Sequence, residues 1–242
     1  MKISRPVIAV AAAALAASTA AGVTFTASAS PTVRSAAGPD PANFTHPQQN
    51  PYFPLTPGFL TKFRGTDSGQ VFHERVLVTH KTKQIQGIKA RVLLDVLRRA
   101  DGTVAEKTHD WYAADNDGNV WYLGEDTATY HRDGTVGSRE GSWEAGAHGA
   151  VAGLIMPADP KPTDAYRQEY WPGHAEDQGW VVSAHENKKV PAGSYRDVVR
   201  TYEWSRLEKN VVGMKFYAPA VGPIIDRELG GEDFVLVSVT QP

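Results

Sequence analysis

Three Asp-Gly pairs stand sixteen residues apart in the middle of the chain, at Asp101-Gly102, Asp117-Gly118 and Asp133-Gly134. Asp-Gly readily adopts the positive φ angles of a type I′ turn, a common two-residue connection in β-hairpins. The segments between the pairs are rich in Val, Trp, Tyr, Leu and Thr, which favour pleated strands. The spacing therefore predicts four consecutive antiparallel strands, at 89–99, 103–114, 119–131 and 135–144.

Further strand-like segments follow at 166–170, 179–186, 196–204, 212–218 and 234–240, with a turn predicted at 190–193. Residues 146–164 are rich in Gly and Pro and predict a long loop over one barrel mouth or one sheet face. Residues 91–99 also fit a short helix, but the Asp-Gly pair behind them favours a strand. We therefore predict an all-β fold, a long-stranded antiparallel meander that forms a curved sheet or a partly closed barrel.

The first 29 residues have the pattern of a signal peptide. Lys2 and Arg5 precede a small-residue apolar run, and Ala27-Ser28-Ala29 offers a cleavage site. A retained membrane anchor is the alternative, but the run is marginal in length for a span. Residues 30–51 are typical of a disordered Pro/Ala/Ser-rich tether, and residues 52–242 suffice for a single β domain. We expect a secreted, extracellular bacterial protein with no stable membrane anchor after signal cleavage.

Composition excludes several classes of function. Lys and Arg number 25 against 27 Asp and Glu, so no basic excess attracts a nucleic acid. The chain has no cysteine, which excludes disulfides, thiolate catalysis and Cys-ligated zinc or iron–sulfur clusters. The motifs of serine hydrolases, zinc proteases and nucleotide-binding loops are also missing. Any chemistry must therefore use carboxylates, histidines and hydroxyl groups.

Two-residue turns at the Asp-Gly pairs would fix the register of the hairpins. Asp110 then lies opposite Glu125, and Ser142 lies on the other side of Glu125. Alternation gathers one set of side chains on one face: Asp95, Glu106, Asp110, Glu125, Glu140 and Glu144, with Leu93, Leu97, Tyr112, Trp121 and Leu123. The opposite face receives Trp111, Tyr122 and Trp143, together with His109 and Asp126.

This carboxylate face allows three interpretations. It can simply face water, with its aromatic rings lying between charges. Because opposed carboxylates repel each other, a cation such as calcium held by Asp110, Glu125 and Glu144 would relieve the repulsion. A proton shared by Asp110 and Glu125 would do the same and would suit an acid/base catalytic pair. The ligand-binding candidates are Tyr112, Trp121, Glu144 and Glu169.

Several blocks of the chain are similar to those of an uncharacterised family of exported bacterial β-rich proteins. They are DWYAxDxxGNVWYxGED at 110–126, GSWEAG at 141–146, YRQEY at 166–170, AED at 175–177, VPAGSY at 190–195 and KFYAPAVG at 215–222. The resemblance implies a curved antiparallel sheet of the lipoprotein-carrier type, and it carries over no catalytic residue. Exported members of this kind are often lipid-anchored. Without a lipobox cysteine, this chain should be free or loosely associated with the cell wall.

Two classes of function follow. The leading hypothesis is a secreted β-sheet domain that binds a small or amphipathic ligand in its concave face. The alternative is an extracellular enzyme, a hydrolase, lyase or isomerase, which uses a carboxylate cluster with or without a bound metal. Burial of Asp110 and Glu125 discriminates between them, because exposed carboxylates would leave the enzyme without its residues.

Overall fold

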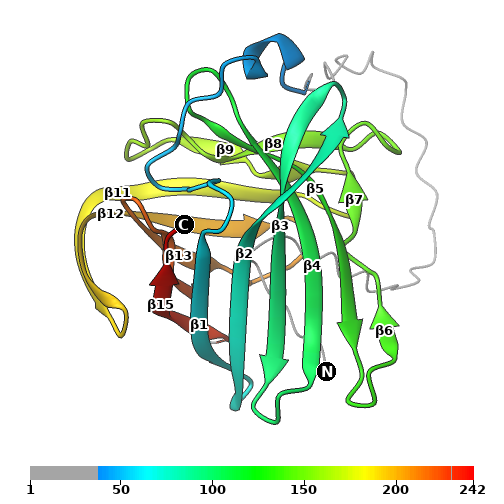
Figure 1. Ribbon diagram of the computed structural model, residues 1–242, viewed down its shortest axis with the longest axis vertical. Coiled ribbons are helices and arrows are strands. Elements are labelled where there is room, and N and C mark those ends of the chain that lie inside the picture. Colours follow the sequence, from blue (N-terminus) through cyan, green and yellow to red (C-terminus); the bar gives the residue numbers. More distant parts are fainter. Residues whose placement is uncertain (1–37, 230) are drawn as a thin grey trace, which may run out of the picture.

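The computed structural model describes residues 38–229 and 231–242, and these form one antiparallel sheet of 15 strands (Figure 1). The expected signal peptide, residues 1–29, lies outside the described residues. The first part of the chain builds a five-stranded meander and two short strands that pair with its last member. These are β1 (Leu60–Asp67), β2 (Gln70–Ile85), β3 (Ile88–Arg99), β4 (Val104–Ala114), β5 (Val120–Tyr130), β6 (Val136–Ser138) and β7 (Trp143–Glu144).

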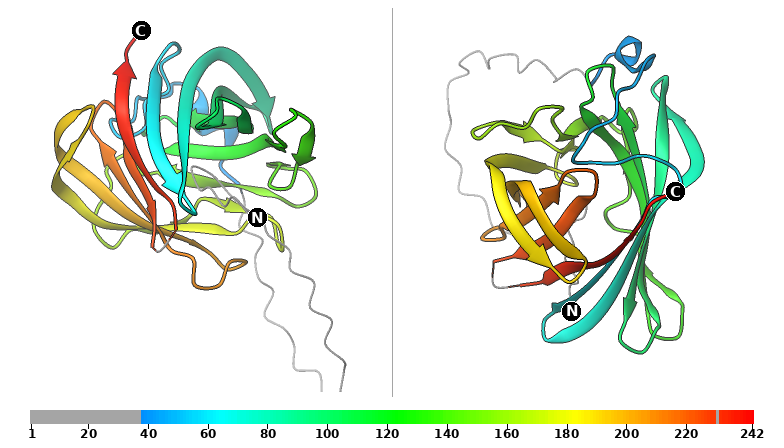
Figure 2. Two further views of the ribbon diagram at one scale, coloured as in Figure 1. Left: turned by 90° about the horizontal axis from the view of Figure 1, so that it is seen from below. Right: turned by 60° about the vertical axis from the view of Figure 1, so that its left-hand side comes forward.

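The second part curls round to face the first (Figure 2). Its strands are β8 (Val151–Met156), β9 (Ala165–Arg167), β10 (Glu169–Tyr170), β11 (Asp177–Val190), β12 (Gly193–Ser205), β13 (Gly213–Ala218), β14 (Gly222–Glu228) and β15 (Asp233–Thr240). β1 pairs with β15, which joins the two parts. The predicted all-β fold is confirmed: the sheet nearly closes into a barrel, and the described residues contain no α-helix.

The two ends of the sheet meet at Gln168, the residue between β9 and β10. β9 pairs with β11 and β10 pairs with β8, so consecutive residues belong to opposite ends of the sheet. A Cβ on Gly153 would lie 2.3 Å from the backbone carbon of Gln168, and one on Gly179 would lie 2.8 Å from the ring of Tyr166. Two glycines therefore allow the strands to approach each other at this junction.

Several strand predictions need correction. The predicted loop at 146–164 contains β8, because Val151–Met156 pairs with β5. The predicted strand 135–144 is interrupted, because Gly141 has a φ of 103° between β6 and β7. β1, β2 and β14 were not predicted at all. The helix alternative for 91–99 is excluded by β3, which pairs with both β2 and β4.

Each Asp-Gly pair closes a hairpin, but the loop is one residue longer than predicted. Arg99 N–H donates to Thr103 O and Gly102 N–H donates to Arg99 O, which leaves three residues in the first loop. Of each pair only the glycine has a positive φ, 85°, 90° and 85° at Gly102, Gly118 and Gly134. A type I′ turn needs positive φ at both central residues, whereas a type I turn with a glycine bulge does not. The prediction of two-residue turns is therefore wrong.

A second irregularity restores the register that the shorter turns would have given. The step from Asp110 to Tyr112 covers two residues of β4, whereas the matching step from Glu125 to Tyr122 covers three residues of β5. The extra residue lies at Gly124, which has a φ of 130°. The predicted pairing of Asp110 with Glu125 is thus confirmed, and two deviations that cancel each other produce it.

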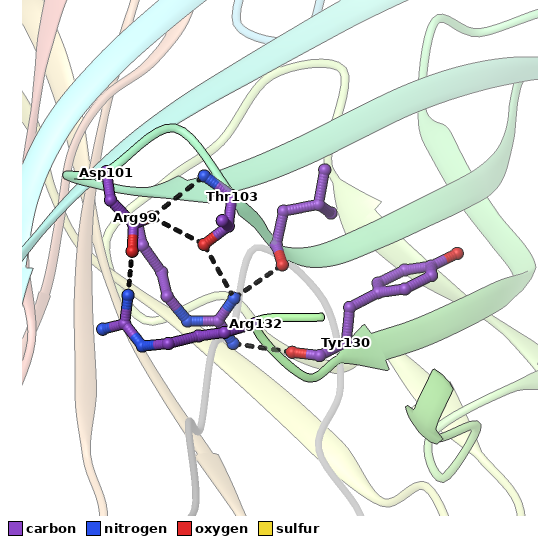
Figure 3. Close-up of polar contacts among 6 residues, drawn as sticks. Arg99, Asp101, Thr103, Tyr130 and Arg132 are labelled. Carbon is purple, nitrogen blue, oxygen red and sulfur yellow. Dashed lines mark hydrogen bonds and ion pairs between the residues drawn. The ribbon is translucent and has the colours of Figure 1, made fainter. Parts of the chain in front are cut away.

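Polar contacts tie the first and third Asp-Gly hairpins together at one end of the sheet (Figure 3). The guanidinium of Arg99 donates to the carbonyl oxygens of Val104 and Tyr130, each at 2.6 Å. Arg132 of the third hairpin forms an ion pair with Asp101 of the first. The long strands β3 to β5 are therefore held in register at the end of the barrel opposite residues 38–57.

Residues 38–57, here named the strap, run across the opposite end of the barrel to reach β1 (Figure 1). Although residues 30–51 were expected to be a disordered tether, part of this segment packs on the barrel. It contains the 3-10 turn η1 (Pro41–Phe44), and its Asn50 is buried. The Asn50 side-chain amide donates to Gly118 O at 2.8 Å and to Pro157 O at 2.9 Å. No helix among the described residues is long and apolar enough to cross a membrane.

Candidate functional site

The barrel encloses a cavity of about 60 Å³, here named the inner cavity. Its apolar lining comes from the strap, both walls of the barrel and β8: Phe53, Pro54, Phe59, Phe63, Val76, Val78, Leu93, Ile155, Val221 and Pro223. Its polar lining converges from opposite walls: Thr61, Glu74, Asp110 and Tyr112 from β1, β2 and β4, and Lys215, Tyr217 and Asp226 from β13 and β14. A small apolar chamber with a few convergent polar groups is the usual form of a binding site.

Asp110 and Glu125 are paired across β4 and β5, and each is only 2 % exposed. The interpretation that this face lies in water is therefore wrong for the pair. Burial raises the pKa of Asp110 well above its usual value, and the nearby carboxyls of Glu106 and Glu74 raise it further. Burial also raises the pKa of Glu125, with Asp110 as the next cause. Since both shifts favour the neutral form, the pair retains protons that exposed carboxyls would lose.

Four aromatic rings form a continuous column beside this pair. Phe53 packs on Tyr112 at 4.9 Å between ring centroids, and Tyr112 stacks on Tyr122 at 4.8 Å. Tyr122 meets Trp143 edge-on at 5.1 Å. The Tyr122 hydroxyl donates to Asp110 Oδ1 at 3.4 Å, whereas the buried Tyr112 hydroxyl has no hydrogen-bond partner among the described residues. The column runs from the strap past the carboxyl pair towards β10.

Glu169 lies at the far end of the column and is 1 % exposed. Burial raises its pKa well above the usual value, and the charge of Asp177 adds to the shift. The Trp143 indole lies beside the Glu169 carboxyl without a well-formed hydrogen bond between them. Burial also raises the pKa of Asp177, to about 7. The structure thus brings the predicted ligand-binding residues Tyr112 and Glu169 into the same interior as Asp110 and Glu125.

The opposite wall supplies a cation. Lys215 is 3 % exposed, and among the described residues it is the one buried Lys or Arg. Its Nζ lies 2.8 Å from Glu203 Oε2 and 3.9 Å from Asp226 Oδ2. Burial alone would lower the pKa of Lys215, but Glu203 and Asp226 outweigh it and raise the pKa above its usual range. The ammonium group therefore stays charged and is compensated locally.

Glu144 and Trp121 do not join this interior. The Glu144 side chain is 40 % exposed and forms an ion pair with Lys83 at 2.6 Å. Trp121 donates its indole N–H to Asp115 Oδ2 at 2.9 Å, in the β4–β5 loop. The extra residue at Gly124 reverses the alternation, so Tyr122 takes the place on the carboxylate face that was predicted for Trp121. Trp143, not Ser142, lies opposite Glu125, because the step from Ser138 to Trp143 covers one residue more than the step from Thr129 to Glu125 on β5.

The calcium site predicted at Asp110, Glu125 and Glu144 is not assembled. Glu144 is held at the surface, and the described residues contain no group of three or more His, Asp or Glu side chains that could hold a metal ion. The remaining members of the predicted carboxylate face separate as well, since Asp95 is buried whereas Glu140 is exposed.

Sequence reasoning missed Glu74, Lys215, Tyr217 and Asp226, which complete the inner cavity. Exposure in β2 alternates from Phe72 to Arg75 and sets Glu74 on the buried face, but the sequence analysis predicted no strand there. Lys215 and Tyr217 belong to one of the blocks that carry the family resemblance, but Phe216 between them is buried as well, so β13 shows no alternation that would single them out.

Together, these features define a class: an antiparallel β-barrel domain with buried carboxyls of raised pKa and one compensated lysine in a largely apolar interior. No protein-family model matches the chain, and no curated protein matches it. One similar solved structure, a Bacteroides fragilis protein described as exported and as having a YmcC-like fold, has 14 % identity and a TM-score of 0.46, covering 78 % of this chain and 99 % of that one. Another, a Parabacteroides distasonis protein described as a lipoprotein, has 14 % identity and a TM-score of 0.40, covering 80 % and 100 %.

Proposed function

We propose that this protein is an exported binding domain that takes a small or amphipathic ligand into its barrel. The observation that supports the proposal most directly is the inner cavity, where Asp110 and Glu74 from one wall face Lys215 and Asp226 from the other across an apolar lining. Since these groups line an enclosed apolar space, a ligand there gains both desolvated contact area and directed hydrogen bonds.

The polar groups specify which end of a ligand would enter. Three carboxyls line the inner cavity, and Lys215, its one basic lining residue, is compensated by Glu203 and Asp226. A hydrogen-bond donor such as an ammonium or hydroxyl group therefore suits the cavity, and an anion does not. A volume of about 60 Å³ holds a few water molecules or the end of a chain, so the rest of a larger ligand must lie outside it.

Binding of octylamine tests the proposal. We expect isothermal titration calorimetry at pH 7 to detect binding, and Asp110→Asn to weaken it about tenfold or more, because a bound ammonium group favours the ionised form of Asp110, whose charge an asparagine cannot supply. Asp126→Asn is the matched control, since Asp126 lies on β5 with a half-exposed side chain paired to Arg139. Failure of octylamine to bind, or equal binding by the Asp110 variant, would overturn the proposal.

An enzyme remains the second candidate because Asp110 both lines the inner cavity and has a raised pKa, as a general acid needs. In that case Asp110 would exchange a proton with a bound substrate. The paired carboxyl of Glu125 would share the negative charge that Asp110 acquires. A panel of small ester, lactone and glycoside substrates distinguishes the two candidates. Turnover that Asp110→Asn abolishes favours a hydrolase, and binding of octylamine without any turnover favours the binding domain.

A further inference from the structure

A second and larger hollow lies beside the inner cavity, between the strap and the adjoining ends of β2, β3 and β4. Its volume is about 520 Å³, and it is here named the outer cleft. The strap contributes Phe44, Phe53, Leu55 and the amide side chains of Gln48, Gln49 and Asn50; the strands contribute Thr82, Lys89, Arg91 and Tyr112 to Ala114. This volume suits a small organic ligand, whereas the inner cavity suits only one end of it.

The charge of the outer cleft is opposite to that of the inner cavity. Lys89 and Arg91 line it, and no Asp or Glu does. Neither cation forms an ion pair with a carboxylate among the described residues, and Arg91 donates one hydrogen bond, to the backbone oxygen of His80 at 3.2 Å. The two cations offer hydrogen-bond donors to an anion, and the side-chain amide of Gln49 lies in the same lining, whereas the amide of Asn50 already donates to backbone oxygens.

The two hollows share Phe53 and Tyr112, which line both of them. Their ring centroids are 4.9 Å apart and their planes are tilted by 57°. A ligand that occupied both spaces would pass along these rings with its apolar part. Phe53 belongs to the strap and Tyr112 to β4, so displacement of the strap would separate the two rings that lie between the hollows.

We propose that the outer cleft is an anion site, in which Arg91 and Lys89 bind a carboxylate or phosphate at one end of the ligand. The half of this proposal that places the other end in the inner cavity rests on the proposed function. The polarity of the two hollows fixes the orientation of such a ligand. Its anion lies outward at Arg91, its apolar part lies along Phe53 and Tyr112, and its donor group lies inward at Asp110.

Four probes with the same chain length separate the two ends: octylamine, octanoate, 8-aminooctanoate and octanol. Calorimetry is expected to show octanoate binding about tenfold tighter than octanol, and 8-aminooctanoate tighter than octylamine by a similar factor, as charge-assisted hydrogen bonds allow. Octyl phosphate in place of octanoate tells which anion the cleft prefers. Both gains should shrink as salt is raised, because Lys89 is exposed to solvent.

The variant that tests the site is Lys89→Gln combined with Arg91→Gln. It should remove the gain in affinity that the carboxylate of the probe provides. Octylamine binding should stay unchanged, which also shows that the variant is folded. Arg98→Gln is the matched control, because Arg98 lies on the same strand but lines neither hollow.

The outcomes separate the two proposals. The anion site is overturned if octylamine binds but a carboxylate on the probe adds no affinity, or if the added affinity survives in the double variant. Either result leaves the proposed function standing. Octanoate binding that depends on Arg91, with no octylamine binding, supports the anion site and overturns the proposed function. If none of the four probes binds, both are overturned.

Discussion

At the scale of single residues, the unusual property of this barrel is the number of acids in its interior. Glu74, Asp110, Glu125, Glu169 and Asp226 are each less than 9 % exposed. An isolated ionised carboxylate in such a place costs several kcal/mol, and burial accordingly raises the pKa of Asp110, Glu125 and Glu169, which favours their neutral forms. Apolar side chains would fill the same positions without that cost, which is why we attribute the carboxyls to binding and not to stability.

The raised pKa of Asp110 makes a prediction about stability. Above about pH 4 the unfolded chain loses this proton while the folded protein keeps it, so the free energy of unfolding falls as pH rises towards the folded pKa. In the Asp110→Asn variant the side chain at position 110 does not titrate. The stability of this variant, measured by urea denaturation from pH 4 to 8, should rise relative to the wild type by up to about 1.4 kcal/mol per pH unit. The curve of Asp126→Asn should stay parallel to that of the wild type; a parallel curve for Asp110→Asn would contradict the burial of an uncompensated carboxyl.

At the scale of elements, the Asp-Gly hairpins show how far a sequence pattern reaches. The pattern predicted strands β3, β4 and β5 and the pairing of Asp110 with Glu125. It did not predict the third loop residue or the bulge that cancels it, because the choice depends on local hydrogen bonds such as that from Thr103 N–H to Asp101 Oδ1. The pairing survived both errors, but the β5 residues between the loop and Gly124 changed face, and so Trp121 was chosen in place of Tyr122.

The bulge in β5 depends on Gly124. Its φ is 130°, and a Cβ there would lie 2.3 Å from the carbonyl oxygen of Trp143. Gly124→Ala should therefore destabilise the protein by about 3 kcal/mol or more, because backbone strain and a clash with β7 both contribute. Gly134→Ala is the control, with a positive φ of 85° but open space, and should cost only about 1 kcal/mol. Chemical denaturation measures both, and equal costs would show that the bulge tolerates a side chain.

At the scale of the whole molecule, the site exists only because two distant parts of the sequence face each other. Asp110 and Tyr112 come from a hairpin that could be predicted, whereas Lys215, Tyr217 and Asp226 come from the opposite wall. Which strands face each other depends on closure at Gln168 and on the pairing of β1 with β15, and no local pattern encodes either. The strap completes the enclosure, because Phe53 lines both hollows.

Asn50 attaches the strap to the barrel, and its removal should open the site. Its amide N–H groups donate to Gly118 O and Pro157 O, and its Oδ1 accepts from Tyr52 N–H at 2.8 Å. Asn50→Ala leaves these buried groups without partners, so we expect a loss of about 1–3 kcal/mol, concentrated in the strap. Limited proteolysis should then cut within residues 38–57 at protease levels that spare the wild type and the exposed-site control Gln49→Ala. If the strap of Asn50→Ala stays resistant while global stability falls, Asn50 supports the barrel as a whole, and the strap is not an independently opening element.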